Sequence, residues 1–110
     1  KQEFAQAKLV LDREEEHLAQ LIEQKKFYEK QAEKLLHGKL DLLEIAANKE
    51  AILKTEEYIL EQNIRVEKAK QLLEKARENL KEVMQERKVQ ESLKEKAFEE
   101  YSSQMRIDVI

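Results

Sequence analysis

Only one position in this chain of 110 residues favours a break in helical structure. Gly38 is the single glycine, and the chain contains no proline. These two residue types are the ones that most strongly interrupt helices, glycine through its conformational freedom and proline through its missing N–H. Charged residues make up 41% of the chain and hydrophobic residues another 41%, a mixture typical of coiled coils rather than globular cores. The sequence therefore predicts an all-α chain with one long helix on each side of Gly38.

Apolar residues recur at alternating spacings of three and four on both sides of Gly38. This spacing is the a/d pattern of a coiled coil, in which the recurring residues form one continuous seam along the helix. Glu14 and Lys25 are the only charged members of the upstream seam. The predicted seam residues are Phe4, Ala7, Leu11, Glu14, Leu18, Leu21, Lys25, Tyr28, Ala32 and Leu35 upstream, and Ile45, Asn48, Ile52, Thr55, Ile59, Gln62, Val66, Ala69, Leu73, Ala76, Leu80 and Val83 downstream.

The residues around Gly38 predict a tight turn between the two helices. Glycine suits the left-handed position that follows a helix, and Asp41 with Glu44 three residues later resembles a capping box. A connection this short makes the helices antiparallel neighbours. We expect a single domain over residues 1–110, with helix 1 at about 1–36, the turn at 37–40 and helix 2 at about 41–105. The predicted fold is a two-helix antiparallel coiled-coil hairpin with one longer helix.

The antiparallel register leaves the end of helix 2 without a facing helix. Matching the seams places Leu35 opposite Ile45, Leu21 opposite Ile59, and Phe4 opposite Ala76. The charged ends of Glu14 and Lys25 are expected to reach water from weak layers of the seam. Residues 80–110 then extend past the start of helix 1 by roughly 45 Å, at 1.5 Å per residue. We expect residues preceding Lys1, another protein, or both to cover this overhang.

The composition argues against several classes of function. Basic and acidic residues are mixed throughout with a net charge of −3, which does not favour nucleic acid or an anionic membrane surface. There is no cysteine, and the two histidines, His17 and His37, lie far apart, so no metal site is expected. A single glycine cannot build a phosphate-binding loop. We expect no enzymatic activity, no cofactor, no small-molecule ligand and no membrane-spanning segment.

Two groups of residues are candidates for protein contacts. Exposed apolar stripes commonly mark interfaces, and aromatic residues dominate their energetics. Near the turn, one group widens the apolar face of the hairpin and is a candidate for contact with a partner protein. Local packing of these residues against helix 1 is an equal alternative. In the overhang, uncovered apolar residues are interspersed with cations that could equally be solvated. The candidates are Phe27, Leu53, Tyr58 and Leu60 near the turn, and Arg87, Lys88, Leu93, Lys94, Lys96 and Phe98 in the overhang.

The order of several short segments resembles one protein family. These segments are Leu35 to Asp41 before a long second helix, Glu86 to Val89, Leu93 to Tyr101, and the ending Ile107 to Ile110. Together they resemble the flagellar export family FliJ over nearly the whole chain. The start usual in that family, about a dozen residues rich in Phe, Arg and Leu, is absent from this sequence. Each segment is common in coiled coils, and it is their order and spacing that carry the resemblance.

The resemblance implies a function without catalysis. It implies a cytoplasmic component of the flagellar type III export apparatus, held at the inner face of the cell membrane only through partners. A hairpin of this family acts as a stalk in the ring of the export ATPase FliI, engages the export gate FlhA and escorts export chaperones. The overhang group would then contact the ATPase, and the group near the turn the gate. Two alternatives stay open: a generic structural or scaffolding coiled coil, and the equivalent stalk of a virulence type III secretion system.

Overall fold

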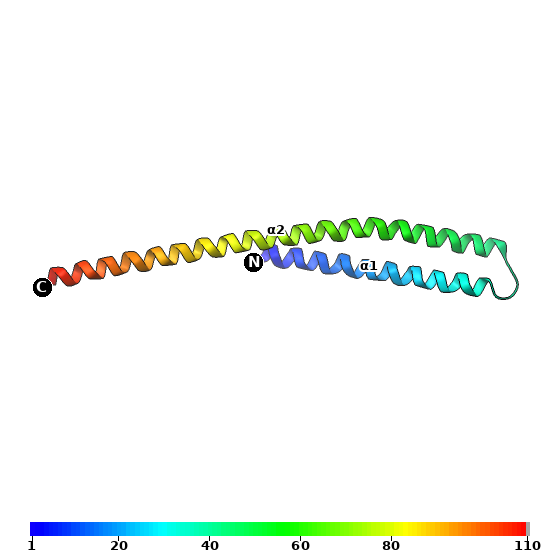
Figure 1. Ribbon diagram of the computed structural model, residues 1–110, viewed down its shortest axis with the longest axis horizontal. Helices are drawn as coiled ribbons and strands as arrows, with labels where there is room; N and C mark the ends of the chain where they lie inside the picture. Colours follow the sequence, from blue (N-terminus) through cyan, green and yellow to red (C-terminus); the bar gives the residue numbers. More distant parts are fainter. Residues whose placement is uncertain (110) are drawn as a thin grey trace.

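The chain forms a long hairpin of two antiparallel helices. The computed structural model describes the backbone of residues 1–109 and the side chains of residues 1–103. Helix α1 spans Gln2–Leu35 and helix α2 spans Leu42–Val109. The molecule measures 105 × 18 × 14 Å, and α1 runs beside only the first part of α2 (Figure 1). The predicted fold class, an all-α coiled-coil hairpin with one longer helix, is confirmed.

Burial follows the predicted seam closely. On α1, all ten predicted seam residues are buried or half-buried, and every other residue of the helix is exposed. On α2, the seam residues from Ile45 to Leu80 are also buried or half-buried, and within that range only Ala51 and Glu56 join them from the flanks. Val83, the last predicted member, is 52% exposed. The core is thus a single row of layers between two helices, which ends where α1 begins.

The turn is built largely as its sequence predicts. The N–H groups of Leu36 and His37 donate to the carbonyls of Glu33 and Lys34, which closes α1. Gly38 has a φ of +106°, in the left-handed region that favours glycine. Asp41 caps α2, because its Oδ1 accepts the N–H of Leu43 at 3.0 Å and that of Glu44 at 3.4 Å.

The helix ends differ slightly from those predicted. Helix α1 ends at Leu35 and α2 begins at Leu42, each one residue inside the expected bound. Helix α2 continues to Val109 instead of ending near residue 105. Ser102 and Ser103 do not end the helix, since serine lowers helix propensity by only a few tenths of a kcal/mol. Ile110, which belongs to the ending quoted for the family resemblance, lies outside the described residues.

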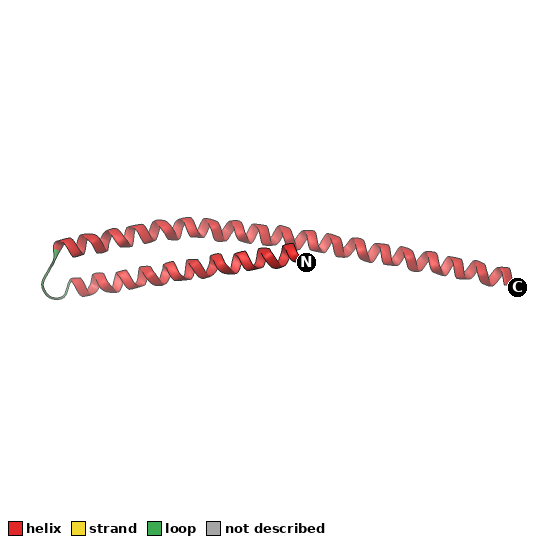
Figure 2. Cartoon of the chain, turned by 180° about the vertical axis from the view of Figure 1, so that it is seen from behind, coloured by secondary structure: helices red, strands yellow, loops and turns green. Residues whose placement is uncertain are grey.

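The second half of α2 extends away from the hairpin as a single helix. Seen from behind, the N-terminus lies beside the middle of α2, and the rest of α2 continues alone to the C-terminus (Figure 2). Residues 81–101 are all exposed. We call residues 81–109 the overhang and residues 1–80 the paired half.

Candidate protein-interaction surfaces

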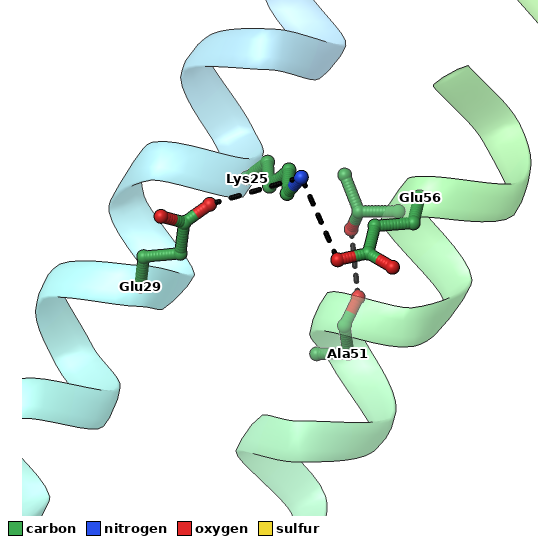
Figure 3. A network of polar contacts seen from close by, with 5 residues as sticks. Lys25, Glu29, Ala51 and Glu56 are labelled. Atoms are coloured by element: carbon green, nitrogen blue, oxygen red, sulfur yellow. Dashed lines mark hydrogen bonds and ion pairs between the residues drawn. The ribbon is translucent and has the colours of Figure 1, made fainter. Parts of the chain in front are cut away.

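Polar layers hold the two helices of the paired half in register. Lys25 is partly exposed, as the sequence predicts for a charged seam residue, and it also makes contacts with carboxylates. Its Nζ lies 3.5 Å from a carboxylate oxygen of Glu56 on α2 and 4.0 Å from one of Glu29 on α1 (Figure 3). Beside this ion pair, the hydroxyl of Thr55 donates to the carbonyl of Ala51 at 2.7 Å. The seam cation is therefore neutralised across the hairpin.

Two amides on α2 make the remaining polar contacts across the seam. Gln62 is 2% exposed, and its Nε2 donates to the backbone oxygen of Glu14 at 2.9 Å and to the Glu14 carboxylate at 2.6 Å. Asn48 donates to the backbone oxygen of Tyr28 at 3.0 Å and lies 3.4 Å from the side-chain oxygen of Gln31. Glu14 is thus hydrogen-bonded across the seam, in addition to any access that its half-buried side chain has to water. Because each amide binds one turn of α1, these layers specify the register.

The four candidate residues near the turn do not form one surface. Tyr58 lines a shallow groove between the helices together with residues that include His17, Gln24 and Arg65. Phe27 follows Gln24 by three positions, so it lies on the same flank. Its ring packs edge-on against that of Tyr28, with the centroids 5.7 Å apart. Phe27 and Tyr58 are 62% and 53% exposed, which leaves both rings accessible. We call this surface the aromatic flank.

Leu53 and Leu60 lie on a different flank. Leu53 lines a second, largely apolar groove near the turn with Leu36 and Ile52 among its other walls. Leu60 follows Leu53 by seven residues, so it lies on the same face of α2 two turns further along. Both leucines are more than half exposed. A single small partner domain would contact one of the two flanks more readily than both.

The turn itself exposes an apolar cluster that the sequence analysis did not single out. Leu36, Leu40, Leu42 and Leu43 are all more than 60% exposed, and Leu43 reaches 83%. Their signal is present in the sequence as leucines that fall off the seam beside the only glycine. They lie at the turn end of the rod, and Leu36 also lines the lateral groove that contains Leu53.

The candidate residues of the overhang lie on two faces of one helix. Arg87 and Lys94 are seven residues apart and continue the seam in its spacing of three and four. Phe98 lies beside Lys94, four residues on. Lys88, Leu93 and Lys96 instead line a shallow groove with Gln85, Val89 and Ser92. At 3.6 residues per turn this groove lies on roughly the opposite side of α2 from the seam. The overhang thus carries a seam face and a groove face.

Other kinds of site find no support in the part of the chain that the structure describes. Within it, no group of three or more His, Asp or Glu side chains is arranged to hold a metal ion. Neither described helix has a stretch apolar enough to cross a bilayer. The grooves are shallow and open along the rod.

Comparison with known proteins gives a family match that covers nearly the whole chain. A family model described as "Flagellar FliJ protein" matches residues 1–107. No curated protein and no solved structure matches the chain. The matched range includes both helices of the paired half, the turn and almost the whole overhang.

Proposed function

The chain belongs to the flagellar FliJ protein family, and we propose that it acts as a stalk in the ring of the export ATPase FliI. Membership makes it a flagellar protein associated with type III export, and the stalk role goes beyond that membership. The observation that carries the proposal is the overhang, in which more than 20 consecutive residues of one helix are exposed on all sides. A single helix is about 10–12 Å wide with its side chains, slender enough to enter the centre of a protein ring.

The groove face supplies the chemistry for such a contact. It combines apolar surface at Val89 and Leu93 with the cations Lys88 and Lys96. An apolar strip can pack against ring loops, and flanking cations favour loops of opposite charge. Each exposed ion pair would contribute about 0.2–1 kcal/mol, so several must act together. We therefore assign the ATPase contact first to the groove face.

The other end of the rod is suited to a second partner. In this proposal the aromatic flank contacts the export gate FlhA, because Phe27 and Tyr58 offer accessible rings beside a groove. Leu53 and Leu60 are then free to contact export chaperones. Binding of purified gate protein to the Phe27→Ala/Tyr58→Ala variant, compared with Leu53→Ala/Leu60→Ala, tests this assignment. Equal binding by both variants and the native chain would remove both flanks from the gate contact.

The proposed role needs no catalysis by this chain. It would be exerted in the cytoplasm, at the inner face of the cell membrane, with attachment through the export apparatus alone. The chain would act on the ATPase by contact, and hydrolysis would take place in the ring. A purified chain that hydrolyses ATP without the ring would contradict this part of the proposal.

Stimulation of a purified export ATPase tests the stalk role. We expect the triple variant Lys88→Ala/Leu93→Ala/Lys96→Ala to lose most of the stimulation given by the native chain. The matched variant Arg87→Ala/Lys94→Ala, on the seam face, should retain most of it. A quadruple change of Arg87, Lys88, Lys94 and Lys96 to Ala, which keeps Leu93, should also clearly reduce the stimulation. Full stimulation by the quadruple variant, with its helical content intact by circular dichroism, would remove the overhang from the mechanism.

A further inference from the structure

Helix α2 carries a second row of apolar residues on the side turned away from α1. In a coiled coil, residues that fall between the seam positions lie on this outer side. All seven residues of the row are exposed, and its four large apolar members are 53–83% exposed. We call the row the outer seam, and at alternating spacings of three and four it reads Leu43, Ala46, Glu50, Leu53, Glu57, Leu60 and Ile64.

The outer seam is confined to one stretch of one helix. Further along the same face, α2 has only polar residues, namely Glu67, Gln71, Glu74 and Glu78. The matching face of α1 is polar apart from one alanine and reads Glu16, Ala19, Glu23, Lys26, Lys30 and Glu33. The side of α2 opposite the outer seam is already occupied by α1, so the outer seam is exposed whatever covers the overhang. A local apolar row with this spacing marks an interface with another helix.

The charged members of the outer seam have a counterpart inside the hairpin. By the matched seams, Lys25 of α1 faces Thr55 of α2. Its Nζ lies 3.5 Å from a carboxylate oxygen of Glu56, the residue that follows Thr55, and 4.0 Å from one of Glu29, one turn on in its own helix (Figure 3). A charged seam residue of this fold thus lies between two opposite charges, one from each helix, and both of them are flank residues.

A second copy of the chain supplies the same arrangement around Glu50. If two outer seams run antiparallel with Leu43 opposite Leu60, Glu50 faces Leu53 of the second copy. The residue that follows Leu53 is Lys54, which also lies one turn after Glu50 in its own helix. Glu50 would then lie between two Lys54 side chains, which is the charge-reversed form of the network around Lys25. Twofold symmetry repeats the arrangement, so two glutamates and two lysines balance at the axis.

Other alignments of two outer seams match less well. In a parallel pair, Glu50 and Glu57 would each face their own counterparts, and the flanks would bring Lys49 beside Lys54. An antiparallel pair shifted by one heptad in one direction places Glu50 beside Glu61. A shift in the other direction leaves only about a heptad and a half in contact. Like charges at an interface disfavour association, so the first alignment is favoured.

We propose that two copies of this chain pair through their outer seams in this antiparallel register. The contact covers residues 43–60 of each copy, roughly 27 Å or about two and a half heptads. Among the described side chains, Glu50 and Lys54 take part in no ion pair within one copy, so both are available at the axis. The copies overlap only at their turn ends, and their overhangs point in opposite directions.

The pairing is weak and reversible, because a contact between two single helices of this length is smaller than a typical stable interface. It covers Leu53 and Leu60, the flank assigned above to export chaperones. Pairing and chaperone contact would therefore exclude each other. The aromatic flank and the groove face remain free in both copies.

Charge exchange at the axis tests the proposal by analytical ultracentrifugation of the full chain. Glu50→Lys and Lys54→Glu should each weaken dimerisation about ten-fold, because each surrounds the axis with four like charges. The combined Glu50→Lys/Lys54→Glu variant restores two charges of each sign and should dimerise within about three-fold of the native chain. Glu78→Lys and Lys75→Glu make the same changes at equivalent heptad positions beyond the contact and should leave dimerisation unchanged. Circular dichroism checks that the helical content of every variant is intact.

A disulfide tests the register. The chain has no cysteine of its own. In the proposed register Ala46 faces Glu57 of the second copy, so the Ala46→Cys/Glu57→Cys variant should form a disulfide-linked dimer on oxidation. Within one copy these positions are roughly 16 Å apart along the helix, too far for a disulfide. A disulfide-linked dimer of the single variant Ala46→Cys would show a parallel pair and overturn the register.

Three results of the ultracentrifugation would overturn the proposal. The first is a native chain that stays monomeric up to about millimolar concentration, where even weak pairing is populated. The second is a combined variant that dimerises no better than the single variants. The third is equal weakening by Glu78→Lys or Lys75→Glu, which would place the contact elsewhere on α2. None of these results bears on ATPase stimulation through the overhang, so failure here is distinguishable from failure of the stalk role.

Discussion

The paired half and the overhang share one heptad pattern but differ completely in burial. In the paired half, Leu21 is 8% exposed and Gln62 is 2% exposed. In the overhang, the seam residue Val83 is 52% exposed, and the seam position equivalent to that of Gln62, occupied by Gln90, is exposed as well. Both regions lie on regular helix, and α2 passes from one to the other without a break. The difference comes entirely from the presence or absence of α1.

This contrast separates two properties that sequence patterns are often taken to indicate together. A heptad pattern indicates which face of a helix can be buried, whereas burial itself depends on a partner being in place. In the paired half the partner is supplied through the Gly38 turn. In the overhang no described helix faces the same residues, and they are exposed. This distinction between the two regions would be contradicted if a substitution in the overhang destabilised the fold as much as its counterpart in the paired half.

The largest expected difference is between two leucine truncations. Leu21→Ala removes a buried seam side chain and should lower the free energy of unfolding by about 2–3 kcal/mol, the lower part of the range for buried leucines. The lower part applies because a two-helix seam leaves each layer partly open to water. Leu93→Ala should change stability by less than about 0.5 kcal/mol, because its side chain is already exposed. Urea unfolding followed by circular dichroism measures both.

The helical content of both leucine variants is the control for this comparison. Both variants should have the helical signal of the native chain before denaturant is added, since leucine and alanine are both strong helix formers. Equal losses of stability in the two variants would show that the overhang is packed in solution. In that case the groove face, on which Leu93 lies, would be covered in solution, and the separation into two regions would be wrong.

Much of the paired half could be predicted because its signals are local and periodic. The single glycine and the cap at Asp41 identify the turn, and the observed φ of Gly38 and the two bonds to Asp41 have the geometry that these residues favour. The seam residues could be identified one by one, because a period of 3.5 residues leaves little choice of face. Only the helix ends differ, by one residue at the turn and by four near the C-terminus.

The polar layers and the contact surfaces were harder to predict, for physical reasons. Whether Lys25 reaches water or Glu56 depends on side-chain geometry across two helices, which a pattern along one helix does not contain. The split between Tyr58 and Leu53 has the same origin, since both widen the apolar face of α2 but on different flanks. The exposed leucines at the turn lie off the seam, where periodicity gives no guidance.

A smaller difference is expected between two amides at equivalent seam positions. Gln62→Ala removes the hydrogen bonds to the backbone oxygen and carboxylate of Glu14 and should lower the free energy of unfolding by about 1–3 kcal/mol. Gln90→Ala is the matched control, because it makes the same change at an exposed seam position. It also gains the same few tenths of a kcal/mol in helix propensity, which cancels in the comparison. Equal unfolding midpoints for the two variants in urea would mean that Gln62 contributes nothing to the register.

The smallest difference concerns the ion pair between Lys25 and Glu56. The two side chains are 34% and 45% exposed, so solvent screens their attraction, and a double-mutant cycle with alanine should give a coupling of about 0.2–1 kcal/mol. The coupling should fall as salt is raised, because a partly exposed pair is within reach of counterions.

The pair of Lys26 and Glu23, within α1 and more exposed, is the matched control and should give a smaller coupling. The overhang supplies the second control, since Lys94→Ala at a seam position without a facing carboxylate should leave the unfolding midpoint nearly unchanged. A coupling for Lys25 and Glu56 no larger than that of the control pair would mean that the cation contributes no more across the hairpin than on the surface. The paired half would then tolerate a seam lysine for the same reason as the overhang, namely access to water.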